Sequence, residues 1–190
     1  RSIMLDYNDI TKGKFIVLDG APYEVLSSNI LRKQQRKPVN QVKLKNLMTG
    51  KHAEKSLQQS DSAPEADIET QTIVYMDSNK GEFWFRDVDD KSKRFNLNEE
   101  IVGEQMKFIK ENSEIIALVF DEKVISIKIP IKAELKVTEA PHAVRGNTAQ
   151  GANKQVTLET GATINAPIFI NEGDIVQVNT ETEEYAGRVN

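Results

Sequence analysis

The sequence of 190 residues contains no cysteine and only two histidines, His52 and His142. Without cysteine there can be no disulfide framework and no thiolate-bound metal, and this composition fits a reducing cytoplasm. The two histidines lie far apart in the chain and show no metal-ligand spacing. We therefore interpret both as ordinary surface or strand residues and expect no metal site.

Long apolar runs are also missing from the chain. No stretch approaches the roughly 20 apolar residues of a membrane span, and no secretory signal core is present. Hydrophobic residues make up 38% of the chain and charged residues 28%, which is typical of a soluble protein long enough for two or three compact domains. We expect a cytoplasmic protein with no membrane partner.

Residues for covalent catalysis are missing as well. No serine lies in a Gly-x-Ser-x-Gly elbow. Gly146 and Gly151 have the spacing of a phosphate-binding loop, but Ala152 and Asn153 follow where that loop needs Lys and Ser or Thr. We expect no catalytic residue, no cofactor and no enzymatic activity.

The net charge of −4 is unevenly distributed. Residues 1–64 carry 11 Lys and Arg against 6 Asp and Glu, residues 65–129 carry 9 against 15, and residues 130–190 carry 5 against 8. Because nonspecific RNA affinity grows with each phosphate that is neutralised, a basic head on an acidic body predicts phosphate contact at one end only. Charge asymmetry of this size also arises by chance in soluble proteins, and charge alone leaves that alternative open.

The densest positive charge is in residues 32–38, Arg-Lys-Gln-Gln-Arg-Lys-Pro, which we call the tip loop. It lies between two strand-like runs, residues 22–26 and residues 39–45, the second of which alternates apolar and polar side chains. Nothing in the tip loop can build a core, and its cations repel one another unless an anion lies among them. We predict that this loop projects into solvent and that its target is RNA.

The remaining pattern is one of short strands and tight turns, and it predicts an all-β fold of three consecutive small barrels. The expected domains are residues 1–64, residues 65–129 and residues 130–190, and the strands and helix of the second suit an OB-like barrel. In the first domain, Asp19-Gly20 predicts a hairpin, and the polar, proline-containing residues 60–65 are interpreted as a linker.

In the second domain, one helix is expected to open at Asn98 as its N-cap and to bury Ile101, Val102, Met106 and Ile109. The aromatic run 83–85 could stack RNA bases or pack in the core. Neighbouring strand residues point to opposite faces, so at least one must face inward, and core packing is favoured. In the third domain, strands are expected at residues 132–138, 156–158, 162–164, 168–170, 175–178 and 185–189.

Several motifs in the two ends of the chain resemble one known family. Lys154-Gln155-Val156, Gly161, Ile164, Ala166-Pro167, Ile170 and Gly173 have the spacing of the signature of bacterial translation elongation factor P, and Tyr185 and Arg188 match its final Tyr-x-x-Arg pattern. Further matching motifs are Asp19-Gly20-x-Pro22-Tyr23, Val42-Lys43-Leu44, Thr49-Gly50, Glu54-Lys55 with Ser60-Asp61-Ser62-Ala63, and Gly81-Glu82-Phe83-Trp84. The resemblance runs nearly from end to end.

This resemblance implies an L-shaped, tRNA-like protein with an SH3-like or KOW-like domain followed by two OB domains. Members of the family bind the 70S ribosome between the P and E sites and stimulate peptide-bond formation when consecutive prolines stall synthesis. They position the acceptor end of the P-site peptidyl-tRNA, and the ribosome itself makes the bond. The implied partners are that tRNA, ribosomal RNA and ribosomal proteins near the E site, and we expect the factor to be a monomer.

The family often carries a modified lysine at the tip of its loop, within a Pro-Gly-Lys-Gly-like turn. Counting back from residues 42–44, the tip here is Gln35, with Gln34 beside it. An amide has no nucleophilic amine, so lysine-directed β-lysylation cannot occur at this position. We hypothesise that the loop works unmodified, with Gln34 and Gln35 contacting the tRNA end. The phosphate contacts would come from Arg32, Lys33, Arg36 and Lys37.

In the third domain, Gly146-Asn147-Thr148 takes the place of the family's Gly-Asp-Thr near the exit-site codon. Asn147 keeps an acceptor and gains donors, so we predict a ribosome or mRNA contact by these three residues together with Tyr185 and Arg188. The runner-up interpretation is the elongation-factor-P-like paralogue, whose tip also lacks the usual lysine. A general single-strand-binding OB protein and a purely structural scaffold fit the acidic body and the basic tip less well.

Overall fold

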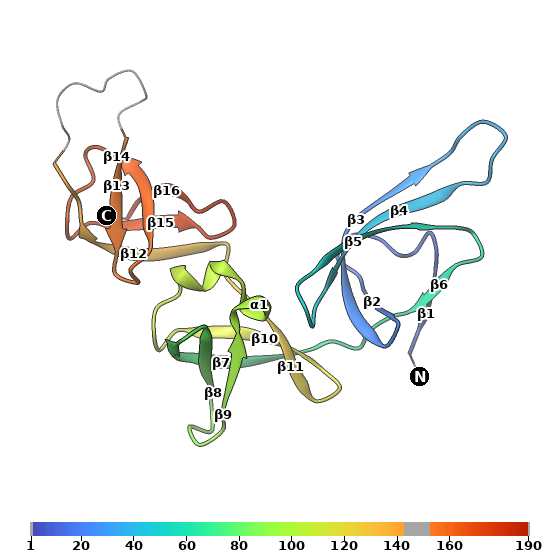
Figure 1. Ribbon diagram of the computed structural model, residues 1–190, viewed down its shortest axis with the longest axis horizontal. Coiled ribbons are helices and arrows are strands. Elements are labelled where there is room, and N and C mark those ends of the chain that lie inside the picture. Colours follow the sequence, from blue (N-terminus) through green and yellow to red (C-terminus); the bar gives the residue numbers. More distant parts are fainter. Residues whose placement is uncertain (1, 143–152, 190) are drawn as a thin grey trace. The chain divides into compact units, whose positions relative to one another are not determined.

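The computed structural model describes residues 2–142 and 153–189 (Figure 1). In these ranges almost all regular structure is β-strand, with one short α-helix, α1 (Glu99–Val102), and one 3₁₀-helix, η1 (Glu104–Phe108). The strands up to residue 64 are β1 (Met4–Asp6), β2 (Phe15–Leu18), β3 (Ala21–Leu31), β4 (Val39–Asn46), β5 (His52–Leu57) and β6 (Ser62–Pro64). Those from residue 69 to 128 are β7 (Glu69–Asn79), β8 (Glu82–Asp87), β9 (Arg94–Asn98), β10 (Glu114–Phe120) and β11 (Lys123–Lys128). The last are β12 (Lys132–Glu139), β13 (Asn153–Leu158), β14 (Thr163–Pro167), β15 (Ile175–Asn179) and β16 (Glu184–Val189).

The strands form antiparallel sheets of the kind that small barrels are built from. Their orders are β1-β6, β2-β3-β4-β5, β11-β10-β7-β8-β9 and β14-β13-β12-β15-β16. The all-β fold class expected from the sequence is confirmed. The chain divides into two compact units, one of residues 1–72 and 116–127 and the other of residues 73–115 and 128–190. The two domain boundaries expected near residues 64 and 129 stay predictions.

The hairpin of β2 and β3 is closed as expected by Asp19 and Gly20. Both residues have positive φ, 51° and 76°, which is the geometry of a type I′ turn. β3 is longer than the expected strand 22–26, because it continues to Leu31 by pairing with β4. A register shift between Val25 and Ser27 marks a bulge in β3. Such a bulge increases the local twist of the ribbon.

Residues 60–65 are not the linker that their polarity suggested. Ser62–Pro64 is a strand that pairs with β1, placing Ala63 opposite Leu5. Ala63 is only 2% exposed and belongs to the apolar core of this part of the chain, together with Leu5, Ile10, Ile16, Val25, Val42, Leu44 and Leu57. One small apolar residue among polar ones gives no period-two pattern, so this strand could not be recognised from its own sequence.

The aromatic residues of β8 alternate as expected. Phe85 is fully buried, with its ring centroid 5.7 Å from those of Tyr75 and Phe95, whereas Trp84 is 36% exposed. Core packing is therefore confirmed for Phe85.

In the loop that follows β8, the Ser92 hydroxyl and N–H donate to the Asp90 carboxylate, and these hydrogen bonds lower the pKa of Asp90 below its ordinary value.

The expected helix starts where predicted but is much shorter. Asn98 is its N-cap, and its side-chain oxygen accepts a hydrogen bond from the N–H of Ile101 at 3.1 Å. At Gly103 the backbone turns to φ 74° and ψ 171°, and the next residues form η1 instead of a second helical turn. Val102, Met106 and Ile109 are buried as expected, whereas Ile101 is only half-buried. The apolar pattern thus predicted burial for three of the four residues and predicted the helix length wrongly.

The last sheet has its core between β12, β13, β14, β15 and β16. Phe108 of η1 is 1% exposed and packs into this core, which includes Leu135, Val156 and Val176. Residues 168–170 are a turn and not the expected strand, because the N–H of Ile170 donates to the carbonyl of Pro167 at 3.0 Å. Ile170 is buried in the core, while the neighbouring Phe169 is 57% exposed.

Candidate functional site

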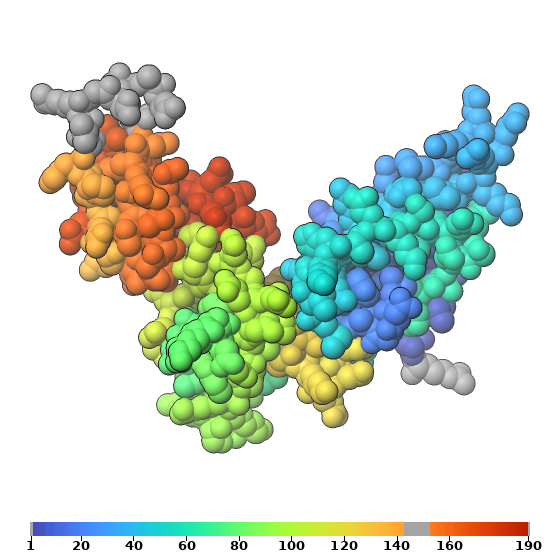
Figure 2. Space-filling model, in the orientation of Figure 1, coloured from blue at the N-terminus to red at the C-terminus, as the bar shows by residue number. Residues whose placement is uncertain are grey.

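The tip loop extends from the end of the β3–β4 ribbon. The last paired residues are Leu31 and Val39, and residues 32–37 are all exposed to solvent. Even in the paired stem, Ile30 and Leu31 are 42% and 37% exposed, so the ribbon has already left the core before the loop begins. Figure 2 shows the loop, in light blue, projecting beyond the rest of residues 1–72. The expected projection into solvent is confirmed.

A tight turn at the end of the loop presents the two glutamines. The N–H of Arg36 donates to the carbonyl of Lys33 at 3.1 Å, so Gln34 and Gln35 are the central residues of a four-residue turn. Gln35 alone of the two has a positive φ, 60°. This is the pattern of a type II turn, which usually has glycine or asparagine at that position. Gln35 is thus held at the tip in a backbone conformation that a glutamine rarely adopts.

The positive charge of the tip loop has no acidic partner in the described residues. None of the ion pairs found there involves Arg32, Lys33, Arg36 or Lys37; on the same ribbon, Lys43 pairs with Glu54 at 3.6 Å, away from the loop. Cations held together without a counter-charge attract a polyanion from solution. The loop can therefore bind phosphate without first breaking an internal salt bridge.

Tyr185 and Arg188 both lie on β16 (Glu184–Val189), on either side of a bulge. Arg188 is paired with Val176 and Tyr185 with Val178, and the register shifts between these two pairs. Val176 and Val178 both face the core, so the side chains paired with them lie on one face of β16. Tyr185 is half-buried and packs against the core of the last sheet. Arg188 is exposed, 3.9 Å from the Asp174 carboxylate, with its guanidinium 5.8 Å from the centre of the Phe169 ring.

The other residues predicted for that contact, Gly146, Asn147 and Thr148, lie outside the described residues. Their role stays a prediction. His52 and His142 are both exposed. Within residues 2–142 and 153–189, no three His, Cys, Asp or Glu side chains come together as metal ligands. No helix in those ranges has the length and apolar character needed to cross a membrane.

Comparisons with known proteins agree over the whole chain. Residues 6–63 match a family model described as the elongation factor P KOW-like domain, and residues 133–188 match one described as elongation factor P, C-terminal. Elongation factor P of Carboxydothermus hydrogenoformans is 34% identical over 186 residues, covering 98% of this chain and 100% of its own. Elongation factor P of a Synechococcus strain is 35% identical over 185 residues, covering 97% and 100%.

Solved structures are also similar over part of the chain, and one of them reaches a TM-score above 0.5. It is eukaryotic translation initiation factor 5A from Methanococcus jannaschii, with a TM-score of 0.51 and 11% sequence identity. The similarity covers 67% of this chain and 95% of the other. At this level of identity the match concerns the fold alone.

Proposed function

The chain belongs to the elongation factor P family and is a translation elongation factor, and from this premise we propose how it works. It binds the 70S ribosome between the P and E sites and stimulates peptide-bond formation where consecutive prolines stall synthesis. The observation that carries the proposal is the tip loop, an exposed turn with four cations and no acidic partner in the described residues.

The tip loop acts by positioning. Gln34 and Gln35 each carry an amide that can donate and accept hydrogen bonds, and the turn holds them at the farthest point of the loop. The phosphates beside the acceptor end of the peptidyl-tRNA are neutralised by Arg32, Lys33, Arg36 and Lys37. Holding the reacting ends in a productive geometry lowers the barrier without a catalytic side chain, so the factor is not itself an enzyme.

The loop works without a covalent extension at its tip. Gln35 has no amine to be acylated, and its exposed amide is available for direct hydrogen bonding. This distinguishes the proposal from the lysine-tipped mode that the family often uses. Intact-mass and peptide mass spectrometry of the protein from its native source should show Gln35 unmodified; added mass at this residue would contradict the proposal.

The remaining partners follow from the proposed binding position. They are the P-site peptidyl-tRNA, ribosomal RNA and ribosomal proteins near the E site, and the factor acts in the cytoplasm as a monomer. Contact with the ribosome or mRNA by Gly146, Asn147, Thr148, Tyr185 and Arg188 is part of the proposal. Because Arg188 is exposed whereas Tyr185 is half-buried, Arg188 is the better placed of the last two for a direct contact.

The test is reconstituted translation of a reporter that carries consecutive prolines, with the unmodified recombinant chain. We expect the wild-type chain to relieve the stall and Gln35→Ala to lose most of this effect. Gln41→Ala is the matched control, because Gln41 is an exposed glutamine of β4 whose side chain donates to Ser56 and not to the tip loop. A reporter without prolines should respond to none of these proteins.

The absence of a lysine at the tip also favours a second candidate, the elongation-factor-P-like paralogue. The same assay separates the two. If the wild-type chain binds ribosomes but leaves the consecutive-proline reporter stalled, the paralogue is supported and the first proposal is wrong.

A further inference from the structure

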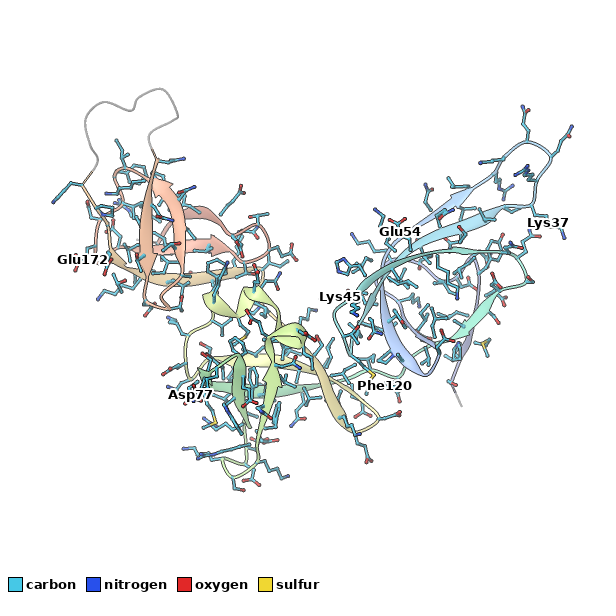
Figure 3. All side chains as sticks on the ribbon, viewed as in Figure 1. Lys37, Lys45, Glu54, Asp77, Phe120 and Glu172 are labelled. Atoms are coloured by element: carbon cyan, nitrogen blue, oxygen red, sulfur yellow. The ribbon has the colours of Figure 1, made fainter. Side chains whose placement is uncertain are left out.

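A second turn lies beside the tip loop at the same end of the β2-β3-β4-β5 sheet. β4 begins at Val39 and β5 ends at Leu57, and Leu57 pairs with Asn40. The tip loop therefore enters β4 where residues 58–61 leave β5. In Figure 3, Lys37 lies at the base of the tip loop beside the connection from β5 to β6. The two turns are neighbours although they are separated in sequence by two strands.

Between the two turns is a hollow of about 240 Å³, which we call the tip hollow. Its lining comprises Lys37, Pro38, Val39, Gln58, Gln59 and Ser60. Pro38 and Val39 are half-buried and supply an apolar wall, whereas the other four side chains are exposed and polar. The hollow thus combines a small apolar surface with an ammonium group, two amides and a hydroxyl.

The charge of the tip hollow favours an anionic ligand. Four larger hollows in the described part of the chain each include two carboxylates in their lining, from Glu99 and Glu104, Glu65 and Asp67, Glu183 and Glu184, and Glu111 and Glu159. The tip hollow has none and includes Lys37. Lys37 directly follows Arg36, another cation of the tip loop, in the chain. Among these surface hollows it is the one where a phosphate meets no carboxylate in the lining.

The second turn, residues 58–61, is stabilised by its own hydrogen bonds. The N–H of Asp61 donates to the carbonyl of Gln58 at 2.9 Å, and the Asp61 carboxylate accepts from the N–H of Gln58 at 2.8 Å. Asp61 is thereby engaged within the turn. The side chains of Gln58, Gln59 and Ser60 form no hydrogen bond within the described residues and are exposed, so they remain available to a ligand.

We propose that the tip hollow binds one unpaired RNA nucleotide, with Lys37 at its phosphate and the Gln58 and Gln59 amides at the edge of its base. The inference rests on the proposed function, since the RNA is that of the ribosomal complex at the tip. Unpaired bases are read by hydrogen bonds to their edges, and an amide offers both a donor and an acceptor, as adenine requires. The volume is below the roughly 300–1,000 Å³ of pockets for larger ligands and suits a single base against Pro38.

The first test measures stimulation of the consecutive-proline reporter at increasing concentrations of factor. For the double variant Gln58→Ala/Gln59→Ala we expect the concentration for half-maximal stimulation to rise about threefold to tenfold, as for loss of one or two hydrogen bonds. Gln41→Ala should leave it unchanged. If the wild-type chain stimulates and the double variant matches it, the tip hollow inference is wrong and the proposed function stands.

The second test detects contact directly and does not depend on stimulation. A photoreactive benzoylphenylalanine replaces Gln59, and the protein is irradiated with ribosomes that carry peptidyl-tRNA stalled at proline codons. We expect crosslinks to RNA, and nuclease mapping then assigns them to the tRNA end or to ribosomal RNA. The same substitution at Gln41 serves as the control.

The two tests keep the two proposals apart. If the chain crosslinks to RNA but does not relieve the stall, the proposed function is contradicted and the nucleotide site in the tip hollow is supported. Crosslinks to ribosomal protein alone, or none above the Gln41 control, would overturn the tip hollow even if the chain relieves the stall.

Discussion

Gln35 combines an exposed amide with an unfavourable backbone conformation. A left-handed conformation costs an L-residue about 1–2 kcal/mol, and Gln35 has φ 60° in a turn where glycine is usual. A residue kept in such a conformation on an exposed loop contributes little to packing. Neither backbone preference nor packing therefore explains a glutamine at position 35, and we expect its side-chain amide to explain it.

Gln35→Gly separates the side chain from the turn. Glycine relieves the backbone strain but has more conformational freedom to lose on folding, so the free energy of unfolding should stay the same or rise by up to about 1 kcal/mol. Stimulation of the consecutive-proline reporter should nevertheless fall as far as with Gln35→Ala. Urea denaturation and the translation assay measure the two effects; a glycine variant that keeps full stimulation would show that the amide is dispensable.

The position of Gln35 could be predicted because spacing along a hairpin is a local property. The family resemblance supplied the anchor, because counting back from the matched Val42-Lys43-Leu44 motif placed Gln35 at the tip, where the turn has it. The turn of residues 58–61 was not predicted: residues 60 and 61 were assigned to a polar linker, and Gln58 and Gln59 were assigned to no element. This turn lies beside the tip loop because β4 pairs with β5. The sequence of residues 58–61 alone contains no signal of that pairing.

α1 and η1 are separated by a single glycine with an unusual backbone conformation. Gly103 has φ 74° and ψ 171°, a region that is essentially restricted to glycine. This residue ends α1 and redirects the chain so that Phe108 of η1 enters the core of the last sheet. Lys107 and Lys110 on the same segment pair with Glu183 and Glu159, at 2.6 Å and 3.6 Å. The connection between these elements therefore depends on one backbone conformation.

Gly103→Ala should destabilise the protein by about 1–3 kcal/mol. No atom lies within 4 Å of the position that the added Cβ would take, so the cost comes from the backbone and not from a clash. Gly187→Ala is the control, since Gly187 of β16 is equally uncrowded and its φ is not positive. Chemical denaturation of both variants gives the comparison. Equal stability of the two would argue against backbone strain at Gly103.

The elements that could be predicted were those that local signals define. The type I′ turn at Asp19 and Gly20, the alternating strands and the Asn98 cap each depend on a few adjacent residues. The misassigned segments depended on partners elsewhere. β6 forms by pairing with β1. In residues 168–170, Ile168 and Phe169 are both exposed and Ile170 is buried, which breaks the alternation of a strand.

The charge of the whole molecule separates a cationic end from an acidic remainder. Residues 1–64 carry a surplus of cations, whereas residues 65–129 and 130–190 carry a surplus of acids. The four cations of the tip loop are exposed and have no acidic partner in the described residues. The salt dependence of ribosome binding should therefore arise mainly from this loop.

Replacing Arg32, Lys33, Arg36 and Lys37 by alanine should weaken ribosome binding and flatten its dependence on salt. Each lost phosphate contact removes about 0.7 from the slope of log affinity against log salt concentration for single-stranded RNA, so the slope should fall by up to about 3. The control replaces Lys91, Lys93, Lys123 and Lys128, four exposed lysines of the acidic part. Binding is measured by sedimentation at constant magnesium. If both quadruple variants change the slope alike, net charge and not the tip loop determines the binding.

The pairing of β1 with β6 has a consequence for how the protein is made. Leu5 and Ala63, about 58 positions apart, lie opposite each other and close the apolar core of the first barrel. The hairpins of β2, β3, β4 and β5 join residues that are close in sequence and can form early, whereas the β1–β6 pair closes a long loop. On a translating ribosome, this barrel cannot be completed until Pro64 has left the exit tunnel. The nascent amino-terminal strand must wait, unpaired, for the segment that will cover it.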